Sequence, residues 1–277
     1  MVARATAPAR TPTGQRRART DSAQVTLSES DGVRYLHFGS VWVQGAMRIA
    51  RPFKLELEYQ QQMMAPALYV PQPARIVQLG LGAAALAKAC WRLLPEAQIT
   101  AVEISAEVIA AAQRWFRLPD DERIELVRDD ALAWISDPRR GGRARADWLQ
   151  VDLYDAAARG PVYDDPAFYA ACRRALARTG VAAINLFGRG FEPSRQAIEA
   201  AFGDDRLRVL PEADAGNRIV LAFAGPVPAL AAAVLYRRAS DLEQRASLPA
   251  RKWASALRAP GAPGSAAKPR NAPRNSA

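Results

Sequence analysis

The chain has 277 residues and 49% hydrophobic content, which is enough for one sizeable core, so we expect one main domain with an appendage. Its net charge of +10 alone would favour nucleic acid or an anionic surface as partner. However, eleven Lys and Arg residues lie in residues 1–20 and 251–277, which hold no acid, so the near-neutral remainder argues against a specific nucleic-acid partner.

The two ends of the chain are rich in Ala, Pro, Arg and Ser and poor in large apolar residues. Such a composition cannot offset the entropy lost on ordering, so residues 1–22 and 258–277 are predicted to be disordered basic tails. The Arg-rich, acid-poor N-terminus also has the look of an organelle transit peptide, and this alternative stays open. There is no apolar run of about 18 residues, so we expect no membrane partner.

Cysteine and histidine are scarce. Cys90 and Cys172 are isolated within expected helices, where we interpret them as small buried hydrophobic residues in a reducing cytoplasm. His37 is the only histidine, so a catalytic triad or a multi-His metal site has little material. We therefore expect a cytoplasmic protein with no metal.

Residues 23–72 are predicted to form a small antiparallel β element and a linking helix. From residue 25 to about 51 apolar and polar residues alternate around Asp31-Gly32, a strong hairpin signal. The following stretch, KLELEYQQQMMAPALYV, has apolar residues at helical spacing, so one helix should lead into the main domain.

Residues 73–226 alternate between strand and helix patterns, which predicts a parallel, doubly wound sheet covered on both faces. The short loop PEADAGN suggests that the last two strands are antiparallel, and residues 227–257 are expected to form terminal helices. The expected strands are 75–79, 98–103, 124–127, 147–152, 181–186, 206–210 and 218–224, and the expected helices are 84–94, 106–116, 130–136, 165–177 and 193–202.

Residues typical of a nucleoside site follow three successive strands. Gly80 and Gly82 allow a tight turn with close backbone approach to a ligand. Glu103 ends the second strand, near the spacing at which an acid accepts hydrogen bonds from ribose hydroxyls. Asp129 and Asp130 follow the third strand, where they can meet an adenine amino group, although these acids can also simply cap the following helices.

The fourth strand, DWLQVD, introduces a family resemblance. Asp152 ends it and Asp155 follows three residues later, and this D-x-x-D resembles the motif of the spermidine synthase family, the polyamine aminopropyltransferases. The resemblance covers about residues 30–225. Its other matching positions are Gln44 in VWVQG, Tyr59 and Gln60 in EYQQQMM, Phe168-Tyr169 and Thr179-Gly180.

The resemblance implies a class I S-adenosylmethionine-dependent transferase, Rossmann-like fold with a seven-stranded, mostly parallel sheet. It implies aminopropyl transfer from decarboxylated S-adenosylmethionine, a co-substrate and not a tightly bound cofactor, to an amine such as putrescine. Asp152 would be the general base, and Asp155, Tyr59, Gln60 and Tyr154 would bind the amine substrate. The positions implied for the co-substrate are Gln44, Gly80, Gly82, Glu103, Asp129 and Asp130.

The chain also departs from the family pattern. Ala83 stands where the family carries an aspartate that contacts the aminopropyl chain, and the loop after D-x-x-D reads AAARGP, with Arg159 as a candidate partner for a substrate carboxylate. Methyl transfer from ordinary S-adenosylmethionine and a non-catalytic, nucleoside-binding role therefore stay open. The resemblance further implies a homodimer.

Overall fold

The computed structural model describes residues 25–39, 43–143, 145–154, 161–187 and 190–257. The expected basic tails lie outside these described residues. Within them, no helix combines the length and the apolar character that crossing a membrane requires. The domain boundaries drawn from the sequence stay predictions.

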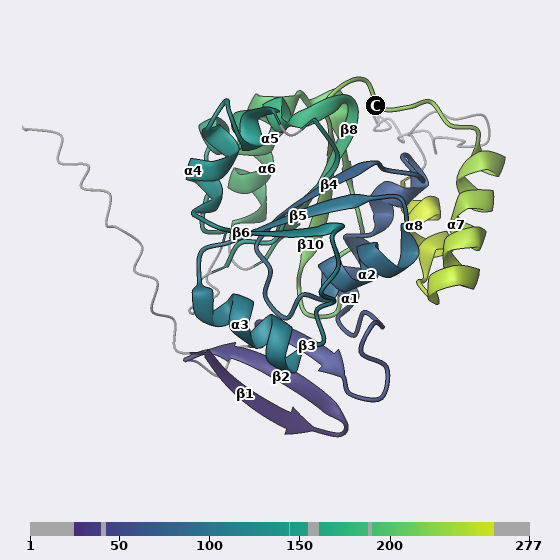
Figure 1. Cartoon of the computed structure of the whole chain (residues 1–277). Helices are drawn as coiled ribbons and strands as arrows, with labels where there is room; N and C mark the ends of the chain where they lie inside the picture. The colour runs from purple at the N-terminus through teal and green to yellow at the C-terminus, as the bar shows by residue number, and fades with distance from the viewer. Residues whose placement is uncertain (1–24, 40–42, 144, 155–160, 188–189, 258–277) are drawn as a thin grey trace, which may run out of the picture.

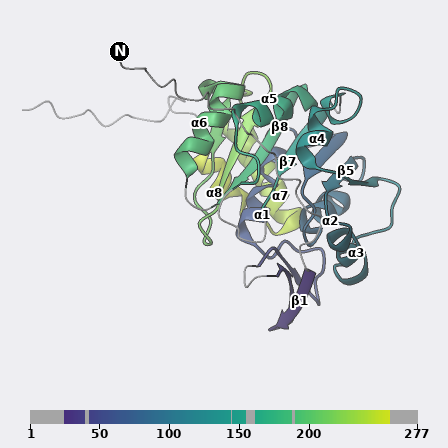
Figure 2. The same cartoon turned by 90° about the vertical axis from the view of Figure 1, so that its left-hand side faces the viewer.

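The N-terminal β element is a three-stranded antiparallel sheet in the order β1-β2-β3. Its hairpin turns at Asp31 and Gly32, which both have positive φ (52° and 74°), as the tight two-residue turn requires. The predicted hairpin is therefore confirmed, and Figures 1 and 2 show this sheet at one end of the molecule, beneath the main sheet. Its strands are β1 (Val25–Ser30), β2 (Val33–Phe38) and β3 (Gly45–Arg48).

The main sheet has seven strands in the order β6-β5-β4-β7-β8-β10-β9. The first five strands in this order are mutually parallel, whereas β10 runs antiparallel to both β8 and β9. The predicted alternation and the antiparallel final pair are both confirmed. The strands are β4 (Arg75–Leu79), β5 (Gln98–Glu103), β6 (Ile124–Arg128), β7 (Ala146–Val151), β8 (Leu176–Leu186), β9 (Leu207–Val209) and β10 (Arg218–Phe223).

Helices cover both faces of this sheet (Figure 1). Successive side chains of a strand point to opposite faces, so Ile76 packs in one core cluster and Val77 in the other. The first cluster lies under α2 (Ala85–Leu93), α7 (Ala232–Ala246) and α8 (Ala250–Ala256). The second lies under α4 (Ala131–Ser136), α5 (Pro166–Ala175) and α6 (Phe191–Phe202), while α3 (Ala106–Trp115) packs next to the small sheet.

The linking helix is shorter than the sequence pattern predicts. It consists of α1 (Glu58–Gln62) followed by a separate 3-10 helix, η1 (Ala65–Leu68). Pro66 lies in the first turn of that second segment, and because proline has no backbone N–H it cannot continue an α-helix from the preceding turn. The residues between Leu55 and Leu68 still pack into the main core, so the segment joins the two sheets as expected.

Candidate active site

A cavity of about 770 Å³ opens where the carboxyl ends of the parallel strands meet, the position at which open α/β sheets bind ligands. The residues after β4, β5, β6, β7 and β8 all contribute to its walls, together with α1 and the loop before β10. Among the described residues that line it there is no Lys, Arg or His. Its carboxylates are Glu56, Glu58, Glu103, Asp129, Asp130, Asp152 and Asp214.

The glycine turn after β4 brings the backbone close to the cavity. Gly80 has φ +94°, and a Cβ on it would lie 2.2 Å from the carbonyl oxygen of Asp152, so no side chain fits there. Gly82 also has positive φ (+51°) and lines the cavity together with Gln44. The structure therefore brings together the two predicted backbone-approach positions, Gly80 and Gly82, and Gln44.

Glu103 anchors this turn to the end of β5. Its carboxylate accepts hydrogen bonds from the backbone N–H groups of Leu81 and Ser105, both at 3.0 Å. Burial raises the pKa of the Glu103 carboxyl, and the backbone donors counteract part of that effect. Glu103 thus lines the cavity as the sequence predicts, and it also fixes the shape of the glycine turn.

Asp129 and Asp130 line the cavity beyond β6, and both already have protein partners. Asp129 forms an ion pair with Arg140 at 2.5 Å. Asp130 caps α4 by accepting from the backbone N–H of Ala133 at 2.9 Å, and it also accepts from the hydroxyl of Tyr163. The capping alternative therefore applies to Asp130, in addition to its place in the cavity wall.

Asp152 lines the cavity directly after the end of β7. One of its carboxylate oxygens accepts from the side-chain amide of Asn185 at 2.8 Å, and the other accepts from the Tyr59 hydroxyl at 3.3 Å. Burial raises the pKa of the Asp152 carboxyl, while the two hydrogen bonds lower it. Burial also holds the pKa of Tyr59 well above its usual range, so Tyr59 keeps its proton and acts as a donor.

The polar lining side chains that were not singled out from the sequence include Asn185, Asn217 and Tyr163. The side-chain oxygen of Asn185 accepts from the side-chain amide of Asn217 at 2.9 Å. Its backbone carbonyl oxygen accepts from the Tyr154 hydroxyl at 2.9 Å. Tyr163 also lines the cavity, next to Asp130. The only signal for Asn185 in the sequence is one polar residue in the apolar strand VAAINLF.

The predicted substrate-binding residues differ in whether they line the cavity. Tyr59 and Tyr154 line the cavity, and Asp155 lies outside the described residues. Gln60 is buried behind Tyr59 and donates to its hydroxyl at 3.3 Å, whereas its neighbour Gln61 lines the cavity. Gln60 therefore touches the site through Tyr59.

The alanine run after Gly82 packs the domain together and does not line the cavity. Ala83, Ala84 and Ala85 are all buried, and they belong to three different core clusters. Ala83 lies against the small sheet, so close that a Cβ on Gly45 of β3 would come within 2.5 Å of the Ala83 Cβ. The interpretation of Ala83 as a residue facing the ligand is thus corrected: its small size lets β3 approach the glycine turn.

These groups can hold a cationic ligand beside a half-buried carboxylate that is able to take up a proton. The raised pKa of Asp152 brings it nearer to the range in which a carboxylate acts as general base. In the described part of the chain, three or more His, Cys, Asp or Glu side chains nowhere gather in a way that could hold a metal ion.

Known proteins resemble the chain both in sequence and in fold. No family model matches it. A polyamine aminopropyltransferase of Chromobacterium violaceum is 32% identical over 228 residues, which cover 81% of this chain and 85% of that protein. A probable spermidine synthase from Corynebacterium glutamicum superposes with a TM-score of 0.65 at 20% identity, covering 88% of this chain and 95% of the other.

A methyltransferase is also similar. Human methyltransferase-like protein 13, solved in complex with SAH, superposes with a TM-score of 0.60 at 25% identity, covering 69% of this chain and 92% of its own. Together with the strand order, these likenesses confirm the predicted class I S-adenosylmethionine-dependent transferase fold.

Proposed function

The chain belongs to the polyamine aminopropyltransferase family, and from this premise we propose that it transfers the aminopropyl group of decarboxylated S-adenosylmethionine to an amine acceptor such as putrescine. Its family makes it an enzyme with aminopropyltransferase-like activity. The identity of both substrates is the part that we propose.

The charge of the cavity carries this proposal. Seven carboxylate side chains line it, and its described lining holds no cationic side chain; of the seven, Glu56 and Asp129 pair with arginines outside the lining. Decarboxylated S-adenosylmethionine brings a sulfonium and an ammonium but no carboxylate, and a diamine brings up to two ammonium groups. Both substrates are therefore attracted by this cavity, whereas an anionic group would be repelled.

Asp152 is the general base of the proposed reaction. A diamine arrives mostly protonated, since its amines titrate near the pKa of lysine, about 10.4. The attacking nitrogen loses its proton to Asp152 and forms a bond to the aminopropyl carbon next to sulfur. The carbon–sulfur bond breaks with its electron pair going to sulfur, so methylthioadenosine leaves as a neutral thioether. Tyr59 and Asn185 hold the carboxylate in place throughout.

The adenosine part is assigned to the other half of the cavity. Gly80 and Gly82 would let the ligand approach the backbone, and Glu103, which lines the cavity, is proposed to accept hydrogen bonds from the ribose hydroxyls. Asp129 or Asp130 is proposed to accept from the adenine amino group, and Gln44 closes this half from the N-terminal element. Asp155 is proposed to anchor the second ammonium of the acceptor, as the family motif implies.

The proposed function is tested by calorimetric titration with decarboxylated and ordinary S-adenosylmethionine side by side. We expect the decarboxylated form to bind more tightly, because the ordinary form adds a carboxylate to an acidic cavity. Release of methylthioadenosine on addition of putrescine would then identify the reaction. Preference for the ordinary form would overturn the proposal, and binding of neither would leave the non-catalytic alternative.

Methyl transfer is the second candidate. It is favoured by the likeness to a methyltransferase solved with SAH and by the absence of a carboxylate at Ala83, which in the family helps to select the decarboxylated form. The structure weakens the second argument, because Ala83 is buried against the small sheet. The seven acids of the cavity do not depend on that position, so aminopropyl transfer stays the first candidate.

Asn185 is expected to set the pKa of the base. Its amide donates to Asp152 at 2.8 Å, and this hydrogen bond lowers the pKa of that carboxyl. Asn185→Ala should therefore raise the pKa of Asp152, move the acidic limb of the kcat/KM profile to higher pH and lower kcat at neutral pH by about tenfold. The measurement is a pH profile of methylthioadenosine release.

Asn185→Asp provides a matched comparison of nearly the same shape. It removes the donor and adds a like charge beside Asp152, so it should move the acidic limb further than Asn185→Ala does. If both variants keep the limb where the native enzyme has it, Asn185 does not tune the base. The expected homodimer and cytoplasmic location remain predictions.

A further inference from the structure

A second cavity, of about 480 Å³, shares no lining residue with the acidic one, although Leu55 and Leu248 of its wall are chain neighbours of residues that line the acidic cavity. Three segments that are far apart in the sequence form its walls: residues 50–55 after β3, the last turn of α2, and the turn between α7 and α8. We call it the basic groove. Its charged lining residues are Arg51, Lys54, Arg92 and Arg245.

No acid lines the basic groove among the described residues, so four cations face one small space. Arg51 and Lys54 are exposed and, within the described residues, form no ion pair or side-chain hydrogen bond. Arg92 stacks on the ring of Phe53, 5.5 Å from its centroid. Like charges that line one small cavity repel one another, so an anion bound in the groove would be stabilised.

Arg245 is held in the groove by weak constraints. It donates to the carbonyl of Leu93 at 3.0 Å, and its nearest carboxylate, that of Asp241, is 3.7 Å away and well exposed. An exposed pair of this kind contributes little and is screened by salt. Most of the positive charge of the groove is therefore uncompensated.

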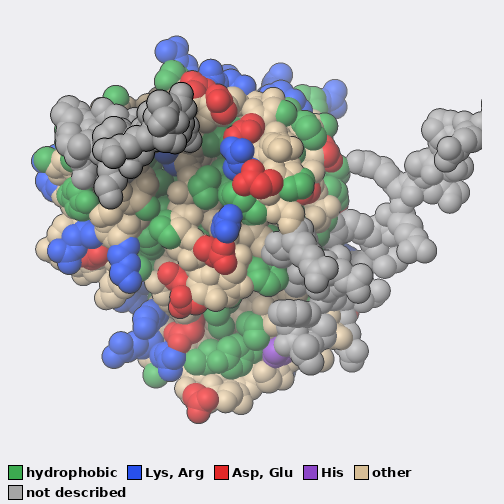
Figure 3. All heavy atoms as spheres, turned by 180° about the vertical axis from the view of Figure 1, so that it is seen from behind, with side chains coloured by type: hydrophobic (Ala, Val, Ile, Leu, Met, Phe, Trp, Pro, Cys, Tyr) green, Lys and Arg blue, Asp and Glu red, His purple; other side chains and the backbone are tan. Residues whose placement is uncertain are grey.

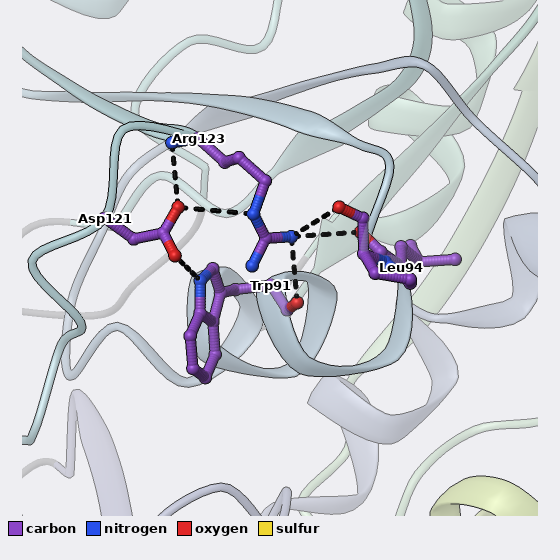
Figure 4. A network of polar contacts seen from close by, with 5 residues as sticks. Trp91, Leu94, Asp121 and Arg123 are labelled. Atoms are coloured by element: carbon purple, nitrogen blue, oxygen red, sulfur yellow. Dashed lines mark hydrogen bonds and ion pairs between the residues drawn. The ribbon is translucent and has the colours of Figure 1, made fainter.

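The C-terminal end of α2, which would otherwise repel an anion, is covered by cations. Arg123 donates to the carbonyl oxygens of Trp91, Leu94 and Pro95 at 3.2, 3.4 and 2.9 Å (Figure 4). Asp121 fixes Arg123 from the other side and also accepts from the Trp91 ring N–H at 2.8 Å. Because these carbonyls have partners, the negative end of the helix dipole is neutralised beside the groove.

We propose that the basic groove binds a small polyanion that carries several phosphate groups, such as a triphosphate chain. Guanidinium groups match phosphate oxygens in pairs, and the volume is in the usual range for small-molecule sites. Figure 3, seen from behind, shows Lys and Arg side chains gathered along its left-hand side, which corresponds to the side of α2 and α7 in Figure 1. The ligand has a charge opposite to that of both substrates proposed for the acidic cavity.

The experiment is calorimetric titration of the full chain with inorganic triphosphate. Binding of one triphosphate is expected, and the double variant Arg51→Ala/Lys54→Ala should weaken it by about tenfold or more. Both side chains are exposed, so the variant is expected to fold normally, which circular dichroism checks. Titration with decarboxylated S-adenosylmethionine reports on the acidic cavity separately and should not change.

Two control variants remove charge elsewhere. Arg174→Ala/Arg178→Ala removes two exposed arginines on the side of α5, and Arg16→Ala/Arg17→Ala/Arg19→Ala removes three from the N-terminal residues. Both should bind triphosphate as the native chain does. The proposal is overturned if the groove variant keeps native affinity, or if the N-terminal variant loses affinity as the groove variant does.

Discussion

Asp152→Asn is expected to lower kcat by about 10²–10⁴-fold, the range of a general base, while the affinity for the nucleoside stays within several-fold. Asparagine has nearly the same shape as aspartate. Its oxygen can still accept from Asn185 and its amide can donate to Tyr59, so the wall around position 152 should keep its packing. What is lost is the group that takes up the proton. The measurement is single-turnover methylthioadenosine release beside calorimetric titration of the co-substrate.

A matched control is Asp165→Asn. Asp165 caps α5 by accepting from the backbone N–H of Phe168 at 2.9 Å, and it does not line the cavity. Asparagine is an equally good cap, so stability and turnover should both stay close to native. An active Asp152→Asn enzyme would remove the proposed mechanism. Equal losses in both variants would mean that the effect is structural.

The fold could be predicted from the sequence because its signals are local. Most strands of the main sheet contain a short apolar run, and up to β8 they alternate in the chain with helices that have their own apolar stripes. The hairpin at Asp31-Gly32 was equally local, since both residues need only positive φ. The linking helix was predicted as one element because helical spacing continues through Pro66, although proline interrupts the backbone hydrogen bonds there.

The side chains that hold Asp152 in place could not be predicted from local sequence signals. Asn185 lies 33 residues from Asp152 in the chain, and it is one polar residue in an apolar strand. Gln78 and Gln150 are likewise single polar residues in apolar runs. However, the Gln78 amide donates to the Gln150 side-chain oxygen at 2.8 Å inside the sheet, and neither residue lines the cavity. Only the register and length of the strands decide which of these amides reaches the carboxyl edge.

The packing of Ala83 could not be predicted from the sequence either. A family motif predicts what a position does when the backbone is shared, but it does not reveal a neighbour from another element. Here Gly45 of β3 approaches Ala83, and both are small. Since Leu36 and Met47 pack in the same cluster, a carboxylate at position 83 would be buried among apolar side chains and would cost stability. The departure from the motif is therefore explained by packing.

Lys88 is the second residue with a large expected effect, this time on stability. It lies in α2 with 1% of its surface exposed, and its ammonium donates to the backbone carbonyl of Phe116 at 2.7 Å. Burial lowers the pKa of Lys88 from 10.5 to about 7. Between these two values the unfolded chain binds a proton that the folded chain has released, so the free energy of unfolding rises with pH across this window.

Lys88→Met should remove this pH dependence. One pKa unit corresponds to about 1.4 kcal/mol, so the native free energy of unfolding is expected to gain about 3 kcal/mol relative to the variant from pH 7 to pH 9.5. At pH 9.5 the native chain should be the more stable, because methionine leaves the buried Phe116 carbonyl without its donor. The measurement is urea unfolding of both proteins at several pH values.

Lys54→Met is the matched control, since Lys54 is exposed and has no side-chain partner among the described residues. Its unfolding curve should run parallel to that of the native chain at every pH. Parallel curves for Lys88→Met as well would show that Lys88 keeps its proton in the folded state. The hydrogen bond to Phe116 would then stabilise the buried ammonium by more than burial destabilises it. A charge buried with a single neutral partner is expected to show the reverse balance.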